Sequence, residues 1–154
     1  MIIRAPQKFV LDDTPSVFLA GSIEMGAAEN WQARAERELR DFIVLNPRRD
    51  DWDSSWVQSI DNTQFREQVE WELYAMDVAD LILMHFEPST KSPVTLLELG
   101  LHAQFGKLIV HCPEGFWRKG NVDIVCKRFN IAQAQTLDQL LSVARSRLGF
   151  LNGC

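Results

Sequence analysis

Residues 92–107 read SPVTLLELGLHAQFGK and lie between two short apolar runs, ADLILMHF at 79–86 and KLIVHC at 107–112. Ser92 followed by Pro93 is a typical helix start, because serine caps free amides and proline fits the first helical position. We expect a core-facing stripe at helical spacing, made of Val94, Leu97, Leu101 and Phe105. Glu98 lies beside that stripe. A carboxylate there is costly to desolvate unless another group pairs with it, so Glu98 is the first candidate for a functional residue.

The composition is that of an ordinary globular domain. The chain has 154 residues, of which 46% are hydrophobic and 24% charged. This length and composition are sufficient for one hydrophobic core that needs no disulfide or metal to hold it together. The formal net charge of -5 argues against general binding to nucleic acid or to anionic membranes, which requires a basic face. No stretch has the length of a transmembrane helix, and the start MIIRAPQKFVLDD lacks a signal-peptide core.

The three cysteines, Cys112, Cys126 and Cys154, form no CxxC pair. An odd count without metal spacing predicts free thiols in a reducing cytoplasm. We therefore expect a cytoplasmic protein with no metal site and no cofactor.

Short apolar runs alternate with helical patterns along the chain. Residues 17–20 run into Gly21-Ser22, which indicates a buried parallel strand followed by a tight turn. Further strands are expected at 42–45, 81–86, 107–112 and 131–134, with a possible edge strand at 2–3 or 9–11. Helices are expected at 27–41, 63–78, 92–107, 122–128 and 136–148. The predicted inward residues of the other long helices are Trp31, Ala35 and Leu39, then Phe65, Val69, Leu73 and Met76, and finally Leu137, Leu140, Leu141, Ala144 and Leu148.

This alternation predicts an α/β fold with a parallel sheet covered on both faces. With five strands and right-handed crossovers, the best arrangement is a single flavodoxin-like, doubly wound domain over 1–154 with strand order 2-1-3-4-5. Ligands bind such sheets beyond the carboxyl ends of strands one and three. Gly21-Ser22-Ile23 and the loop leading to Ser92 meet there, so the fold brings Glu98 beside the Gly-Ser turn.

Backbone amides of the Gly-Ser turn and of two helix starts suit an anion such as phosphate at this crevice. A buried Glu98 could attack a sugar carbon as nucleophile, while a second acid protonates the leaving base. No Ser-His-Asp or Cys-His constellation is present, and GSIEMG departs from the GxGxxG of dinucleotide-binding proteins. Lone histidines are more often structural, which is our interpretation of His85, His102 and His111.

Three segments together resemble the nucleoside 2-deoxyribosyltransferase family and the related nucleoside 5'-phosphate N-hydrolases: VFLAGSI at 17–23, WELYAMDVADLILMHF at 71–86 and SPVTLLELGLHAQFGKLIV at 92–110. The resemblance implies that Glu98 is the nucleophile at the anomeric carbon. It also implies an acid on the second helix, for which Glu72 is the best match and Asp77 the alternative. A nucleoside or nucleotide substrate and a homodimer or higher oligomer are implied as well, since sites of this family are often completed by a neighbouring subunit.

The chain departs from the family pattern at several positions. Phe18 stands where members of the family commonly carry a catalytic Tyr. Ser92 stands where the transferases usually have Asp, and a Ser at this position is the pattern of the phosphate-binding hydrolase branch. The loops at 47–62 and 113–121 match neither branch. They either pack on the core or supply substrate contacts, which we expect to be stacking on a base by Trp52 or Trp117 and sugar or phosphate contacts by Arg118 or Asn121.

Three hypotheses follow. The leading one is an enzyme that cleaves an N-glycosidic bond through Glu98, by base exchange or by hydrolysis. A non-catalytic nucleotide-binding domain is the second, favoured by Phe18. A flavin or redox domain is disfavoured, because no phosphate loop rich in Ser and Thr follows the first strand. Ser22 and Ser92 predict that a 5'-phosphate is tolerated and preferred over the bare nucleoside.

Overall fold

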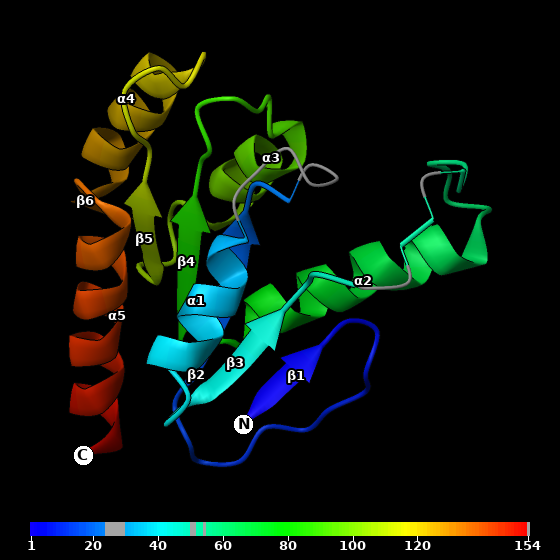
Figure 1. Cartoon of the computed structure of the whole chain (residues 1–154), viewed down its shortest axis with the longest axis horizontal. Coiled ribbons are helices and arrows are strands. Elements are labelled where there is room, and N and C mark those ends of the chain that lie inside the picture. Colours follow the sequence, from blue (N-terminus) through cyan, green and yellow to red (C-terminus); the bar gives the residue numbers. More distant parts are fainter. Residues whose placement is uncertain (24–29, 50–51, 54, 154) are drawn as a thin grey trace.

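Six parallel strands form one sheet in the computed structural model, which describes residues 1–23, 30–49, 52–53 and 55–153 (Figure 1). In the order β1-β3-β2-β4-β5-β6, the strands are β1 (Ile2–Arg4), β3 (Ile43–Asn46), β2 (Ser16–Gly21), β4 (Leu81–His85), β5 (Leu108–His111) and β6 (Ala132–Ala134). The five strands from β2 onward keep the predicted order 2-1-3-4-5, so the α/β, flavodoxin-like prediction is confirmed. The predicted number of strands is wrong, because β1 adds a sixth.

Strand β1 pairs in parallel with β3 at the edge of the sheet. Of the two possible edge segments, the one at 2–3 is confirmed: Ile2 lies opposite Val44 and Arg4 opposite Asn46. Ile3 is buried in the core, with 2% of its surface exposed. A single inward side chain in a three-residue strand is too short a pattern to distinguish from a loop by sequence, which explains the miscount.

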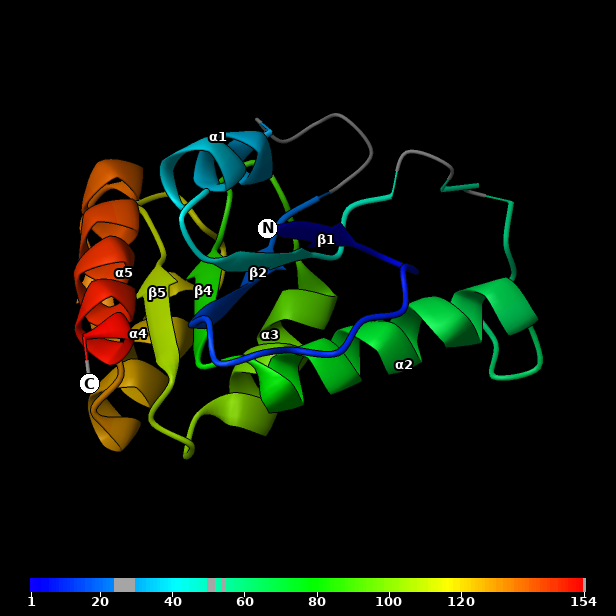
Figure 2. The ribbon, with the colours of Figure 1, turned by 90° about the horizontal axis from the view of Figure 1, so that it is seen from below.

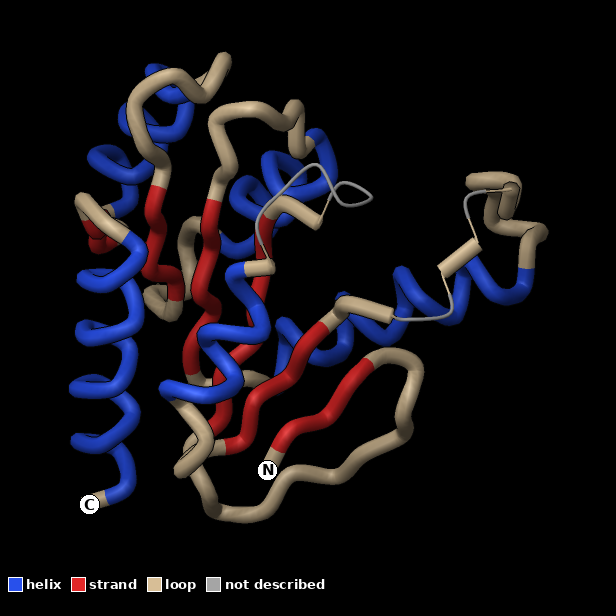
Figure 3. Tube along the Cα trace, in the orientation of Figure 1, coloured by secondary structure: helices blue, strands red, loops and turns tan. Residues whose placement is uncertain are grey.

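Helices cover both faces of the sheet (Figures 1 and 2). The tube in Figure 3 shows α1 and α5 in front of the strands, with α2 and α3 behind them. The helices are α1 (Trp31–Glu38), α2 (Thr63–Val78), α3 (Pro93–His102), α4 (Lys119–Phe129) and α5 (Leu137–Asn152). Residues 27–29 of the predicted first helix lie outside the described residues, and α4 starts earlier than predicted. No helix in the described ranges combines the length and apolar character that a bilayer span requires.

The core on the α1 and α5 side matches the prediction. Strand residues Val17 and Leu19 are fully buried there. They pack in one cluster with the predicted inward residues Trp31, Ala35, Leu39, Leu140, Leu141, Ala144 and Leu148. Their neighbours Phe18 and Ala20 point to the opposite face, as alternation along a strand requires.

The predicted inward face of α3 is wrong. The predicted stripe points to solvent, with exposed fractions of 58% for Val94, 63% for Leu97, 45% for Leu101 and 61% for Phe105. The buried side of the helix consists of Thr95, Glu98, Leu99 and His102. Because apolar side chains stand on more than one side of this helix, the spacing predicted a helix but could not determine its rotation.

The predicted stripe of α2 is only partly right. Met76 is buried, whereas Leu73 is 40% exposed. The buried residues of α2 are Gln68, Trp71, Ala75 and Met76. The amino-terminal turns of α2 extend beyond the sheet (Figures 1 and 2), so only the later turns have a core to face.

Candidate active site

The turn after β2 stands at the switch point of the sheet, where β2 lies between β3 and β4. Gly21 has φ of 143°, and a Cβ added there would lie 2.3 Å from the carbonyl oxygen of His85. Only glycine fits this close approach without displacing β4. The backbone N–H of Ser22 donates to the same carbonyl at 3.0 Å, so the predicted tight turn is fastened to β4.

Three buried hydroxyls join this turn to the loop that follows β4. Ser22 Oγ lies 2.9 Å from Thr90 Oγ1 and 2.5 Å from Ser92 Oγ. The Thr90 and Ser92 hydroxyl oxygens are 2.7 Å apart. Thr90 also donates to the Glu87 carbonyl, and the Glu87 N–H donates to Ser22 Oγ, both at 2.9 Å. The structure therefore brings Ser22 and Ser92 together, as the fold argument predicted.

Ser92 begins α3 in an uncommon conformation. Its backbone is left-handed, with φ of 45°, and its side chain makes no capping hydrogen bond to the helix. The hydroxyl is engaged in the cluster with Ser22 and Thr90 instead. The amides of the first turn of α3 thus receive no cap from Ser92, and such amides favour an anion.

Glu98 lies on the buried side of α3 with 7% of its surface exposed. The hydrogen bonds found among the described residues include none to its carboxyl group. Burial raises the pKa of Glu98 to about 8, and the negative charge of Glu72 contributes to the rise. A carboxyl group in this state exchanges its proton near neutral pH.

Glu72 reaches the same region from α2. Burial raises the pKa of its carboxyl group to about 7, and a hydrogen bond from Gln68 partly opposes the rise. Gln68 Nε2 donates to Glu72 Oε1 at 2.7 Å. The charge of Glu72 on α2 therefore acts on Glu98 on α3, and burial raises the pKa values of both carboxyl groups toward neutral pH.

The structure does not bring the alternative acid, Asp77, to this pair. Asp77 is exposed in the last turn of α2, and its charge acts on His102 and Lys107. Lys107 Nζ donates to the carbonyls of Met76 at 2.6 Å and of Asp77 at 2.8 Å. Lys107 thus closes the carboxyl end of α2, where a cation is favourable.

Other predicted contacts lie apart from the carboxyl pair. Phe18 is fully buried, with its ring centroid 6.4 Å from that of Trp71. Ile23 follows Ser22 and is half-buried. The ring of Trp52 packs edge-on against that of Trp56, with centroids 5.0 Å apart. A substrate role for these three predicted residues stays a prediction.

Two of the predicted residues after β5, Trp117 and Arg118, lie near the residue that precedes Ser92. Trp117 is 46% exposed and donates its indole N–H to the carbonyl of Lys91 at 2.9 Å. Its ring lies under two cations, Lys91 Nζ at 4.6 Å and Arg118 Cζ at 4.3 Å from the centroid. Asn121 is exposed in the first turn of α4. The ring of Trp117 therefore holds two positive charges beside the start of α3.

The segments that carry the site also match a known protein family. The family described as nucleoside 2-deoxyribosyltransferase like matches residues 14–116, which is more than half of the chain. The chain belongs to this family. Its members are nucleoside deoxyribosyltransferase-like enzymes, so the predicted family and the general class of glycosyl transferase or hydrolase are confirmed. A search of curated proteins found no significant match.

The matched range contains the turn, the hydroxyl cluster and both carboxyl groups of this deoxyribosyltransferase-like chain. Sequence reasoning missed Gln68 and Lys91. Gln68 precedes Glu72 by four residues, a spacing that places two side chains on one helix face, so a signal for it was present. Lys91 directly precedes the serine of the helix start, but nothing local links it to Trp117.

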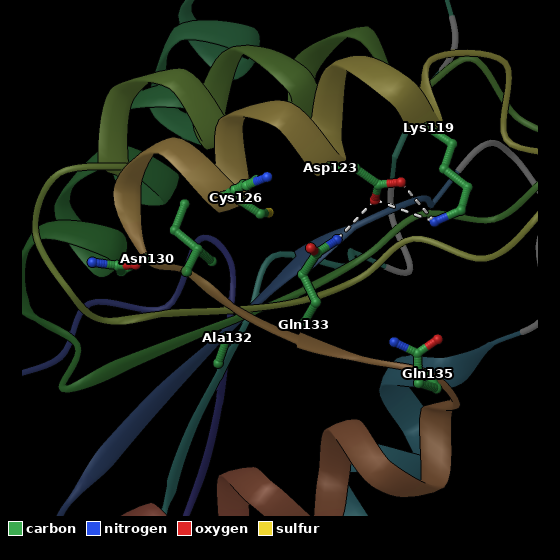
Figure 4. Close-up of a pocket in the computed structure, with 9 residues that line it drawn as sticks. Lys119, Asp123, Cys126, Asn130, Ala132, Gln133 and Gln135 are labelled. Carbon is green, nitrogen blue, oxygen red and sulfur yellow. Dashed lines mark hydrogen bonds and ion pairs between the residues drawn. The ribbon is translucent and has the colours of Figure 1, made fainter.

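An open pocket of about 610 Å³ between α4 and β6 contains neither Glu72 nor Glu98 (Figure 4). Lys119 and Gln133 both bond to Asp123 there, so these polar groups satisfy one another. Within the described residues, no group of three or more His, Cys, Asp and Glu side chains is arranged to hold a metal ion.

Proposed function

We propose that this protein cleaves the N-glycosidic bond of a nucleoside or nucleoside 5'-monophosphate through a covalent glycosyl–Glu98 intermediate. The observation that carries the proposal is the pair of Glu98 and Glu72, which interact electrostatically and whose pKa values are raised to about 8 and about 7. Two carboxyl groups that titrate near neutral pH can act as a nucleophile and as a proton donor in the same pH range. Both groups are needed to break a bond to a leaving base.

In the first step, a carboxylate oxygen of Glu98 bonds to the anomeric carbon of the sugar. The bond from that carbon to the base nitrogen breaks, its electron pair leaves with the base, and Glu72 gives its proton to the base. In the second step, water attacks the same carbon, the ester bond to Glu98 breaks, and Glu72 accepts the proton of the water. A second base in place of water would give transfer instead of hydrolysis.

A 5'-phosphate fits the surroundings of Ser92. The proposed phosphate contacts are the uncapped amides at the start of α3, aided by the positive charges of Lys91 and Arg118 on Trp117. A charge-assisted hydrogen bond of about 1.5–3 kcal/mol corresponds to roughly ten- to a hundredfold in specificity.

The phosphate preference is tested with Ser92→Asp, which adds a negative charge at the start of α3. Wild type should favour the monophosphate over the nucleoside, and Ser92→Asp should lose or reverse this preference in kcat/KM. Ser89→Asp, on an exposed position of the same loop, is the matched control and should keep it. Wild-type preference for the free nucleoside, with transfer of its sugar to a second base, would favour the transferase reaction.

The reaction itself is tested by incubating the pure protein with a panel of nucleosides and their monophosphates. Release of free base, followed by chromatography with and without an added acceptor base, supports the enzyme and separates transfer from hydrolysis. The second candidate is a non-catalytic nucleotide-binding domain, which the apolar Phe18 in place of Tyr favours. Tight binding of a monophosphate by calorimetry without release of base would support that alternative.

For the assembly we propose a homodimer formed through the outward face of α3. Four large apolar side chains of this face are exposed: Val94, Leu97, Leu101 and Phe105. Gly100 lies among them on the exposed side, with no atom within 4 Å of an added Cβ, which permits close approach of a second helix. Exposed apolar patches of this kind mark interaction sites.

The assembly is tested by light scattering coupled to size-exclusion chromatography. Leu97→Glu should convert a dimer into a monomer. Ile124→Glu, at a residue of α4 that is 72% exposed, is the control and should leave the dimer intact. A monomeric wild type, or a Leu97→Glu variant that still dimerises, would contradict this interface.

A further inference from the structure

We infer that Gln68 is the positioning residue that holds the Glu72 carboxyl group in place and stabilises its ionised form. The inference rests on the proposed function for the meaning of the two carboxyl groups, but its geometry stands independently. Gln68 lies on α2 one turn before Glu72 and is 4% exposed. It is thus a buried amide whose hydrogen-bonding groups need partners.

Both hydrogens of the Gln68 amide are used. Nε2 donates to the carbonyl oxygen of Pro47 at 2.8 Å and to Glu72 Oε1 at 2.7 Å. Pro47 follows β3, so the first bond fixes the amide relative to the sheet, and the second fixes the carboxyl group relative to the amide. Glu72 is therefore held by the body of the domain as well as by its own helix.

The two acceptors also determine which way the amide faces. Rotating the amide by half a turn would place its carbonyl oxygen against the Pro47 carbonyl and the Glu72 carboxylate, leaving three acceptors without a donor. In the observed orientation Gln68 Oε1 is buried without a hydrogen-bond partner among the described residues. An unpaired buried oxygen is unfavourable, and this orientation persists because the alternative leaves more groups unpaired.

The consequence is an asymmetry between the two carboxyl groups. A donor to a carboxylate stabilises its charged form, and the Gln68 bond lowers the pKa of Glu72 against the effect of burial. No corresponding donor to Glu98 exists among the described residues. Gln68 thereby stabilises the Glu72 carboxylate that forms when the proton passes to the leaving base, and the same carboxylate then accepts the proton of the attacking water.

The test is Gln68→Met, which keeps the length of the side chain and removes both donors. The basic limb of the pH dependence of kcat, where Glu72 loses the proton that it must donate, should move up by about one pH unit, the size expected for loss of a charge-assisted hydrogen bond. Titration of the Glu72 carboxyl carbon by NMR, assigned with Glu72→Gln, should move up equally. Gln64→Met, at an exposed position of the same helix, is the control and should move neither.

The NMR titration is a second measurement, and it requires no substrate. A Gln68→Met variant that is less stable but keeps both the Glu72 titration and the basic limb would overturn the inference, because a tether to Pro47 alone would then explain Gln68. If no substrate releases base, the proposed function fails, while the NMR titrations still decide the role of Gln68.

Discussion

Helices α3 and α5 cover opposite faces of the same sheet, and they present opposite sides of themselves. Helix α5 buries its apolar stripe, including Leu140, Leu141 and Leu148, and α3 exposes its own. Its buried side instead carries Glu98, together with Thr95, Leu99 and His102. Helix α5 therefore contributes mainly apolar side chains to the core. Helix α3 buries fewer apolar side chains and places a carboxyl group against the sheet instead.

The largest expected effect in this comparison is on the buried carboxyl group of α3. Glu98→Ala should lower turnover by about a thousandfold or more, because the proposed first step needs this nucleophile. The fold should stay intact by circular dichroism. Glu70→Ala, at an exposed carboxylate of α2, is the control. Activity of Glu98→Ala close to wild type on the best substrate would remove Glu98 from the mechanism.

The two apolar stripes should differ in their contributions to stability. Leu141→Ala removes a side chain that is 1% exposed and should reduce the free energy of unfolding by about 2–5 kcal/mol. Leu97→Ala, at 63% exposure, should change it by at most about 0.5 kcal/mol in dilute solution, where chains are separate. Urea denaturation measures both. Equal losses would mean that α3 also packs through its stripe.

Burial of Glu98 should make stability depend on pH. Its folded pKa, about 8, lies above the ordinary value of 4.5, so the folded state holds the proton more tightly and stability falls as the pH rises between these values. Glu98→Gln removes this titration. The variant should exceed wild type in unfolding free energy by about 2–4 kcal/mol at pH 9, and the difference should shrink toward pH 4. A difference independent of pH would exclude burial of the charge as its cause.

The smallest expected effect concerns the two helix starts. Thr136 caps α5 in the usual way, because its Oγ1 accepts a hydrogen bond from the Gln139 N–H at 3.1 Å. The Ser92 hydroxyl instead bonds to the hydroxyls of Ser22 and Thr90. Thr136→Ala should lower the free energy of unfolding by about 1 kcal/mol, and Thr136→Ser should keep most of the stability that the cap provides. Thermal denaturation compares the two. A neutral Thr136→Ala would show that the cap is not needed.

Several features follow from local sequence alone. Short apolar runs separated by helical segments, together with the right-handed crossover rule, are sufficient for the α/β fold and for the order of the five strands from β2 onward. Glu98 stands out because a carboxyl group in an apolar helix is unusual whichever way the helix is rotated. The Gly21-Ser22 turn is readable too, since glycine at the end of a buried strand signals a close backbone approach.

Other features were decided only by the tertiary structure. Glu72 and Asp77 lie five residues apart on α2, and which of them meets Glu98 depends on how the helix is rotated and on where its first turns leave the sheet. The same holds for the outward stripe of α3 and for the contact of Lys91 with Trp117. Periodicity specifies spacing along one helix. Its rotation and position on the sheet come from the packing of residues distant in sequence, and no local pattern contains that information.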